Sequence, residues 1–366
     1  MKRVLHMVGT MNMGGQETFI MNLYRQIDKE KIQFDFVVHS KEKGYYDNEI
    51  ERLGGKIYRI TPIGRNVWKH CKELYYILKE NPDYIFHRHT CSSIVAIDLL
   101  VAKFAKIKRR IVHCHATQTT SHKCINLLFR TAMNCLATKK LACSNNAGIF
   151  LFGKNQRYEV IYNAIDIQKF IFNEEIREKI REKYNATDNS IIGHVGRFDK
   201  SKNHKFLLEI FQEILKIKKD AQLWLIGDGE LKDFIINSAI ERKIEKNIKF
   251  FGTVNNVNEF LMAMDIFVFP SIYEGLGIAL IEAQCTGIKC VVSENIAEEA
   301  IITDNAEKLK LNNNPEEWAK RILSITSKER KIDVKSWKIQ RYQIENSTKR
   351  MIEIYTELQM RKDIKK

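Results

Sequence analysis

The stretch Asp265-Ile-Phe-Val-Phe-Pro-Ser-Ile-Tyr-Glu-Gly-Leu-Gly-Ile-Ala-Leu-Ile-Glu-Ala283 predicts a buried strand, a glycine-containing turn and a helix, in that order. Its first part, Ile266–Pro270, is a short apolar run that is typical of a strand covered on both faces. In the turn Gly275-Leu276-Gly277, the glycines let backbone N–H groups approach a ligand closely. The start of the helix that follows favours a phosphate at that place.

Two glutamates belong to this unit. Glu274 stands on the turn, where its carboxylate can accept hydrogen bonds from sugar hydroxyls. Glu282 lies two turns into the helix and can reach a ribose diol, as acidic residues do at dinucleotide sites. The alternative is a helix cap together with a solvated glutamate. We favour the binding interpretation because both glutamates share one strand–turn–helix unit.

The same alternation of short apolar runs and helical patterns extends over nearly the whole chain. We expect strands at Arg3–Gly9, Phe34–Ser40, Lys56–Ile60, Tyr84–His89, Arg110–His115, Lys140–Ser144, Tyr158–Tyr162, Ile191–Gly196, Ala221–Gly227, Ile248–Gly252, Ile266–Pro270, Lys289–Ser293 and Glu307–Leu311. Strands that alternate with helices in this way form parallel sheets covered on both faces. Ligands then bind at the carboxyl ends of the strands.

A polar stretch at residues 167–187 interrupts the alternation, and a length of 366 residues suits two domains. We therefore expect an α/β fold with two Rossmann-like domains, residues 1–166 and 167–366, that face each other across a cleft. Apolar residues at helical spacing between Ser336 and Gln359 predict a long C-terminal helix. This division places that helix in the second domain.

Two cations, Arg197 and Lys202, follow a predicted strand end and are five residues apart. If they converge, they can neutralise a diphosphate and stabilise its charge as it leaves. A solvated basic turn is the alternative. We favour the first interpretation because the paired glutamates also follow a strand end in the same domain.

In the first domain, Gly14 and Gly15 lie in the turn that follows the first strand and opens the first helix. Such a loop permits a phosphate, but many turns of this kind carry glycines, so the signal is weak alone. The pairs His87-x-His89 and His113-x-His115 end two predicted strands, and alternation places each pair on one face. No acidic residue or cysteine stands nearby at ligand spacing, so we expect no metal site.

These motifs together resemble the retaining glycosyltransferases of family 4, which have the GT-B fold. Glu274 and Glu282 match that family's paired glutamates, which are separated by seven residues. Further segments are similar to its motifs: Val195–His204, Ile226–Gly229, Val160–Asp166 and Asp265–Ser271. The chain departs from the family pattern at Ala164, where glycine is usual.

The resemblance implies roles for the candidate site residues. Gly14 and Gly15 would line the donor diphosphate and the acceptor side, and His115 would contact the donor sugar. We expect His115, Glu274, Arg197 and Lys202 to be catalytic. The residues expected to bind the donor are Gly14, Gly15, Arg197, Lys202, Glu274, Gly275, Leu276, Gly277 and Glu282. His113 is expected to be structural.

The implied activity is retaining sugar transfer from a nucleotide-diphosphate sugar, expected to be UDP-linked, to a glycan or polyprenyl-linked acceptor in surface polysaccharide synthesis. No two aspartates stand two residues apart, so no D-x-D pair can hold a metal on the diphosphate. We therefore expect no cofactor and no metal requirement. The alternatives are a nucleotide-sugar 2-epimerase of the same fold and a non-catalytic module that binds RNA or membranes.

Charge is distributed unevenly along the chain. Residues 1–170 contain 27 Lys and Arg against 14 Asp and Glu, whereas residues 171–366 contain 33 against 31. Five cations, Lys103, Lys106, Lys108, Arg109 and Arg110, stand in the segment 101–110 beside Val101, Phe104 and Ile107. This segment is either a solvated face or a patch that docks on an anionic membrane.

The expected location follows from the apolar segments. No apolar run approaches the about 20 residues of a membrane span, and the first residues lack the features of a signal peptide. We expect a cytoplasmic protein, peripheral at the inner face of the cell membrane if residues 101–110 dock there. We expect it to bind no nucleic acid.

Overall fold

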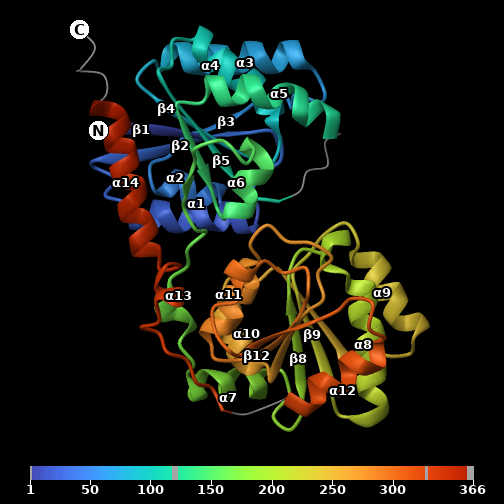
Figure 1. Cartoon of the computed structure of the whole chain (residues 1–366). Helices are drawn as coiled ribbons and strands as arrows, with labels where there is room; N and C mark the ends of the chain where they lie inside the picture. The colour runs from blue at the N-terminus through green and yellow to red at the C-terminus, as the bar shows by residue number, and fades with distance from the viewer. Residues whose placement is uncertain (1, 118–122, 326–328, 361–366) are drawn as a thin grey trace. The chain divides into compact units, whose positions relative to one another are not determined.

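The structure is a computed structural model of the 366-residue chain, and it describes residues 2–117, 123–325 and 329–360. The chain divides into two compact units, in each of which strands and helices alternate (Figure 1). The first unit comprises Met1–Ala164 and Ile344–Lys366, and the second comprises Ile165–Gln343.

Across the described residues of the first unit, seven parallel strands form one sheet in the order β3-β2-β1-β4-β5-β6-β7. The strands are β1 (Lys2–Met7), β2 (Ile32–Val38), β3 (Ile57–Arg59), β4 (Ile85–Thr90), β5 (Arg109–Cys114), β6 (Lys139–Ala142) and β7 (Glu159–Val160). Every residue of β2 is buried, as expected for a parallel strand that helices cover on both faces.

Helices cover both faces of this sheet. Tyr24 of α1 (Gly15–Gln26) and Tyr355 of α14 (Ile344–Met360) both pack on the ring of Phe34 in β2. On the opposite face, Asp98 of α4 (Ala96–Phe104) forms an ion pair with Arg88 of β4. The other helices are α2 (Asp47–Arg52), α3 (Val67–Glu80), α5 (Lys123–Leu136), α6 (Asn145–Phe152) and the short 3₁₀ helix η1 (Ser93–Val95).

The predicted C-terminal helix is confirmed as α14, but it belongs to the first unit, which corrects the division at residue 166. Met351, Ile354 and Leu358 join the hydrophobic core beneath β1 and β2. The Tyr355 hydroxyl lies 2.9 Å from His87 Nδ1 of β4. Helical periodicity predicts an apolar stripe, but it does not say which core receives that stripe.

In the described part of the second unit, six parallel strands form a sheet in the order β10-β9-β8-β11-β12-β13. The strands are β8 (Ile191–Val195), β9 (Gln222–Ile226), β10 (Ile248–Gly252), β11 (Ile266–Phe269), β12 (Lys289–Ser293) and β13 (Ala306–Leu309). All thirteen strands of the two sheets were predicted from the sequence.

Alternate residues of β9 show how the helices of this unit are divided between the faces. Leu223 and Leu225 join a core with α8 (His204–Ile217), α9 (Lys232–Glu241) and α12 (Pro315–Ile325). Trp224 points to the other face and contacts Phe260 of α10 (Val257–Ala263). The remaining elements are α7 (Glu174–Lys183), α11 (Ile278–Cys285), α13 (Trp337–Gln340), η2 (Ile167–Phe170), η3 (Lys200–Lys202), η4 (Glu245–Asn247) and η5 (Glu298–Ala300).

Numbered within each unit, both sheets contain the strand order 3-2-1-4-5-6, which is that of the Rossmann fold. The expected pair of Rossmann-like domains is therefore confirmed. No helix among the described residues is long and apolar enough to cross a membrane.

We predict that Tyr355→Phe destabilises the first unit by about 1–2 kcal/mol, because it leaves Nδ1 of the buried His87 without its partner. The measurement is hydrogen exchange of the β1 and β4 amides together with urea unfolding. Tyr76→Phe is the control, since the Tyr76 side chain is half exposed. Equal effects of the two substitutions would contradict the role given to Tyr355.

Candidate functional site

The strands β8 and β11 are neighbours in the second sheet, although β9 and β10 lie between them in sequence. The chain leaves β8 toward α8 on one face and leaves β11 toward α11 on the other. Open parallel sheets bind ligands at such a reversal, beyond the carboxyl ends of the strands. The turn after β8 carries Arg197 and Lys202, and the turn after β11 carries Glu274.

The structure joins two of the predicted site residues directly. Lys202 Nζ lies 2.5 Å from Glu274 Oε1, and their side chains are only 14% and 9% exposed. The Lys202 ammonium also lies 4.9 Å from the centre of the Phe269 ring. This mostly buried ion pair keeps the ammonium and the carboxylate next to each other. The Lys202 ammonium can therefore contact an anionic ligand while Glu274 remains next to it.

Backbone and side-chain hydrogen bonds hold the turn that carries Lys202. Asp199 Oδ1 accepts from the Ser201 amide at 2.8 Å, which starts the 3₁₀ turn η3. Asn203 then adopts a left-handed conformation at the start of α8. The Ile272 amide donates to the Ser201 carbonyl at 2.7 Å, so the turns after β8 and β11 are tied together.

Arg197 is exposed, and it forms no ion pair among the described residues. The next residue, Phe198, is buried, and its amide donates to the Asp228 carbonyl at 2.9 Å. A Cβ atom at Gly227 would lie 2.0 Å from the Gly196 carbonyl oxygen, and one at Gly229 would lie 2.5 Å from that of Phe198. The Gly227-Asp228-Gly229 turn therefore supports the backbone that presents Arg197.

The glycine turn before α11 contains a left-handed backbone conformation that glycine adopts readily. Gly277 has a φ of 78° and caps the helix, a backbone conformation that other L-residues rarely adopt. Leu276 is buried, so its side chain is not available to a ligand. Gly275 and Glu274 are partly exposed beside it.

Glu282 lies on α11 and is only 9% exposed. Burial raises the pKa of its carboxyl group to about 8, because a charge there loses most of its hydration. Glu282 is therefore mostly protonated at neutral pH before a ligand binds. In that form its carboxyl group donates one hydrogen bond and accepts others, whereas a carboxylate only accepts.

In the first unit, Gly14 and Gly15 stand between β1 and α1, as predicted. Gly14 is the extended residue that precedes the helix, and its carbonyl accepts from the Thr18 amide at 2.8 Å. A Cβ atom on Gly14 would lie 2.4 Å from Glu17 Oε2, so a larger residue would displace the Glu17 carboxylate. β1 and its neighbour β4 form the reversal point of this sheet.

His115 follows β5 and uses both ring nitrogens within its own unit. Nδ1 lies 2.9 Å from Asn163 Oδ1, and Nε2 lies 2.8 Å from His89 Nδ1. Burial lowers the pKa of His115 to about 4, so the ring is neutral. A contact between this ring and a donor sugar requires one of the two hydrogen bonds to be exchanged.

Two further residues take part in this arrangement and were not predicted from the sequence. His6 Nδ1, on β1, lies 2.9 Å from His89 Nε2. Asn163, which is 48 residues from His115 in sequence, orients the His115 ring through its Oδ1 atom. Asn163 stands in the Val160–Asp166 motif, which was the signal available for it. His6 is a single histidine in an apolar strand, and only the pairing of β1 with β4 brings it to His89.

The basic segment 101–110 is only partly exposed, which corrects the five-cation patch. Arg109 is buried and donates to the Asp83 carbonyl, and Arg110 donates to the Leu136 carbonyl. Val101 and Ile107 are also buried. The three lysines of the segment are exposed, and so is Phe104.

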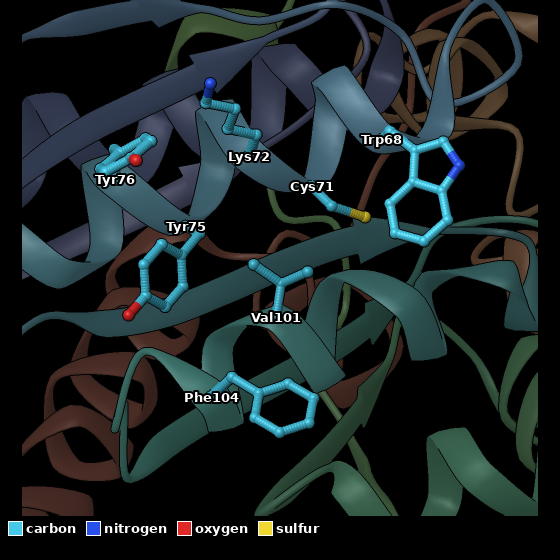
Figure 2. A pocket seen from close by; sticks show the side chains of 7 residues that line it. All are labelled: Trp68, Cys71, Lys72, Tyr75, Tyr76, Val101 and Phe104. Atoms are coloured by element: carbon cyan, nitrogen blue, oxygen red, sulfur yellow. The ribbon is translucent and has the colours of Figure 1, made fainter.

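Phe104 belongs to a larger apolar surface of the first unit. A groove of about 380 Å³ lies between α3 and α4. Its lining residues are Trp68, Cys71, Lys72, Tyr75, Tyr76, Val101 and Phe104 (Figure 2). The Trp68 side chain is 88% exposed at one end of it. The neighbouring helix α5 adds the exposed Leu127 and Leu128.

Comparisons with known proteins agree with the fold and the motifs. The family "Glycosyltransferase Family 4" matches residues 13–169, and "Glycosyl transferases group 1" matches residues 176–350. EpsF of Bacillus subtilis, named as a glycosyltransferase, is 37% identical over 309 residues, which are 81% of this chain and 80% of that protein. The capsular polysaccharide biosynthesis glycosyltransferase CapH of Staphylococcus aureus is 29% identical over 371 residues, 97% of this chain and 99% of that protein.

A third relative has a more specific name, and a solved structure shares the fold. The UDP-Gal:alpha-D-GlcNAc-diphosphoundecaprenol alpha-1,3-galactosyltransferase of Escherichia coli is 28% identical over 287 residues, 71% of this chain and 72% of that protein. HepE of Anabaena, solved in complex with UDP and glucose, superposes with a TM-score of 0.80 at 16% identity. That alignment covers 98% of this chain and all of HepE.

The fold and the site thus define a sugar-transferring enzyme built from two Rossmann-like domains. The chain belongs to the glycosyltransferases of the GT-B fold, because both halves match these families and EpsF is similar over most of its length.

We predict that Glu282→Gln removes a pH dependence of stability. The raised pKa means that wild-type stability is fully present below pH 4.5 and declines as the pH rises through about 8. Between pH 4.5 and about 8, the free energy of unfolding of the variant should rise relative to that of the wild type by about 1.4 kcal/mol for each pH unit. Unfolding by urea across the window measures the difference, and Glu241→Gln at an exposed position is the control. A constant difference at all pH values would contradict the raised pKa.

Proposed function

We propose that this glycosyltransferase is retaining and independent of metal ions, and that it transfers a sugar from a UDP-sugar to a polyprenyl-linked glycan in surface polysaccharide synthesis. The observation that carries the proposal is the meeting of Lys202 and Glu274 at the reversal point between β8 and β11. A buried cation and a carboxylate beside a glycine turn suit a sugar diphosphate.

Arg197 and Lys202 would hold the diphosphate of the donor. Lys202 is the buried cation, and Arg197 extends from the same turn with an exposed guanidinium. As the bond between the sugar and the diphosphate breaks, negative charge grows on the leaving phosphate. Two cations beside it stabilise that charge more in the transition state than in the ground state.

The other site residues would orient the donor. The backbone N–H groups of Gly275, Leu276 and Gly277 would approach the phosphates, and Glu274 would accept hydrogen bonds from the sugar. Glu282, protonated before binding, would share hydrogen bonds with the ribose diol. In the first unit, Gly14 and Gly15 would face the phosphates and the acceptor, and His115 would contact the sugar.

Retention requires the new bond on the face from which the diphosphate leaves. We propose that the anomeric carbon loses its bond to the diphosphate oxygen and gains one to the acceptor hydroxyl oxygen on the same face. The hydroxyl proton passes to the departing phosphate, and the sugar has oxocarbenium character in between. In this path the leaving group itself acts as the base.

Relatives support the choice of donor and acceptor. The name of the Escherichia coli relative gives a UDP-linked donor, an undecaprenyl-diphosphate acceptor and an alpha linkage. CapH is named for capsular polysaccharide biosynthesis, and HepE was solved with UDP and glucose. These names describe those proteins, and they indicate the reaction to test first in this chain.

The purified chain should transfer sugar from one of a panel of UDP-sugars to a polyprenyl-diphosphate glycan, in the presence of EDTA, with an alpha linkage by NMR. Arg197→Ala should lower kcat by about 100–1,000-fold, as loss of one transition-state donor does, with a smaller change in KM. Lys200→Ala, at an exposed basic residue of the same turn, should retain activity.

Other outcomes would overturn parts of this proposal. A free epimerised sugar nucleotide without transfer would identify a 2-epimerase. A beta-linked product would exclude retention, and activity that requires added Mn²⁺ would exclude the metal-free path. An equal loss of kcat in Arg197→Ala and Lys200→Ala would contradict a specific role of Arg197 at the diphosphate.

We further propose that the α3–α4–α5 face docks on the membrane that holds the acceptor. We define this face by its exposed apolar residues Trp68, Tyr76, Leu100, Phe104, Leu127 and Leu128 and by the exposed lysines Lys72, Lys79, Lys103, Lys106 and Lys108. Aromatic side chains at an interface combined with lysines suit shallow insertion into an anionic leaflet.

The chain should co-sediment with vesicles that contain phosphatidylglycerol, and less so as salt is raised, because salt screens the charges. Replacing Lys103, Lys106 and Lys108 by glutamine should weaken this binding, since each lysine contributes about 1 kcal/mol. The matched control replaces Lys219, Lys243 and Lys246, three exposed lysines of the second unit. Equal binding to neutral vesicles, or equal loss in the control, would contradict docking through this face.

A further inference from the structure

The first unit contains a cluster of five imidazole rings on three neighbouring strands. We call it the histidine cluster: His6 of β1, His87 and His89 of β4, and His113 and His115 at the end of β5. Residues two apart on a strand share a face, so all five rings lie on the side of the sheet that α1 and α14 cover. His6, His87, His89 and His113 are buried.

A chain of hydrogen bonds sets the tautomers of three of these rings. Asn163 Oδ1 accepts from His115 Nδ1–H, which leaves the lone pair of the neutral ring on Nε2. His115 Nε2 then accepts from His89 Nδ1–H, and His89 Nε2 accepts from His6 Nδ1–H. This series of hydrogen bonds ends at His6 Nε2, which has no hydrogen-bond partner in the part of the protein that the structure describes.

His113 does not take part in this chain. Both of its ring nitrogens are buried, and neither forms a hydrogen bond of ordinary geometry among the described residues, although burial lowers its pKa and the Ile161 backbone lies close enough to raise it slightly. Buried polar groups are rarely left in this state, because each costs about 1–3 kcal/mol. Its ring centre lies 4.1 Å from that of His115 and 5.5 Å from that of His89. A ligand that pairs with His113 would therefore also meet these two rings.

We propose that His89, His113 and His115 form a binding site for a first-row transition-metal ion such as Zn²⁺ or Co²⁺. One ligand nitrogen from each ring lies within 4.8 Å of the others. His89 Nδ1 and His115 Nε2 already face each other at 2.8 Å, so an ion can replace the proton that they share. His113 supplies the third nitrogen.

The surroundings of the three rings suit such an ion. The other nitrogen of His115 donates to Asn163, and ligating histidines usually donate their second N–H to an oxygen in this way. His115 is partly exposed, which leaves room for a water molecule or a further ligand at the fourth position.

The proton that the ion displaces has a place to go. When His89 coordinates through Nδ1, it loses that proton and gains one at Nε2 from His6 Nδ1. His6 in turn takes a proton at its unpartnered Nε2 atom. All rings stay neutral, and the bond between His89 and His6 survives with its direction reversed. No net proton needs to leave the buried cluster.

Imidazole nitrogen favours zinc, cobalt and nickel, whereas magnesium prefers oxygen ligands. The site is therefore different in kind from a divalent ion on a sugar diphosphate. It differs from our expectation from sequence that the histidine pairs bind no metal, which stays untested. That expectation rested on the lack of an acidic residue or cysteine at ligand spacing, whereas the proposed ligands are three histidines from the two pairs. With Nδ1 held by Asn163, His115 Nε2 can bind the ion or contact the donor sugar but not both, so the ion site belongs to the chain without donor.

The test uses the full chain without a purification tag, stripped of metal and then given Co²⁺ or Zn²⁺. We expect one ion per chain after desalting and a melting temperature that rises with ion concentration, because the ion binds only the folded state. The visible spectrum of the cobalt protein should be that of a four-coordinate site with three nitrogen ligands. X-ray absorption of the zinc protein should show imidazole ligands, which tests the site without any variant. Absence of binding, or a spectrum without imidazole, would overturn the proposal.

Substitutions then locate the site. His113→Leu should abolish binding while the fold remains intact, because His113 loses no hydrogen bond. Asn163→Ala should weaken binding by about 10–100-fold. His87→Leu should retain binding, since His87 is not a ligand, and His204→Leu is the control at a buried histidine of the second unit. Undiminished binding in His113→Leu, or equal loss in His204→Leu, would overturn the assignment.

Discussion

The reversal of chain direction between neighbouring strands organises both units. After β8 the chain turns to one face of its sheet, and after β11 it turns to the other, so no helix connects the ends of these two strands. The same reversal separates β1 from β4 in the first sheet. Residues that are far apart in sequence meet there because parallel strands deliver their carboxyl ends to one edge. The ion pair of Lys202 with Glu274 and the contact of His6 with His89 both result from this arrangement.

The two units place different chemistry at this edge. In the second unit, the mostly buried Lys202 and Glu274 form an ion pair. Burial also favours the neutral form of Glu282 there. In the first unit, neutral imidazoles are linked by hydrogen bonds, and burial keeps them neutral. The first arrangement suits an anionic ligand. The second offers nitrogen lone pairs to an electron-pair acceptor such as a metal ion.

Several features of the second site were predictable because their signal is local. Gly277 needs a left-handed backbone at the start of α11, and glycine is the residue type that adopts it readily. Glu274 and Glu282 lie on one strand–turn–helix unit, so their spacing carries information. The partner of Lys202 was not predictable in this way, since 72 residues separate it from Glu274. The sequence also could not show that Arg109 and Arg110 are not freely exposed, because the carbonyl groups that accept their hydrogen bonds belong to residues distant in sequence.

The sequence by itself determined the thirteen strands, the Rossmann-like class of both units and the amphipathic helix at the C-terminus, because these depend on local periodicity. Only the tertiary structure decided that α14 completes the first unit, where Tyr355 meets His87. It also decided that the His87–His89 and His113–His115 pairs form one cluster with His6. Periodicity specifies which side of an element is apolar or polar. Which elements become neighbours depends on strand order and on the packing of distant surfaces, and no local pattern encodes these.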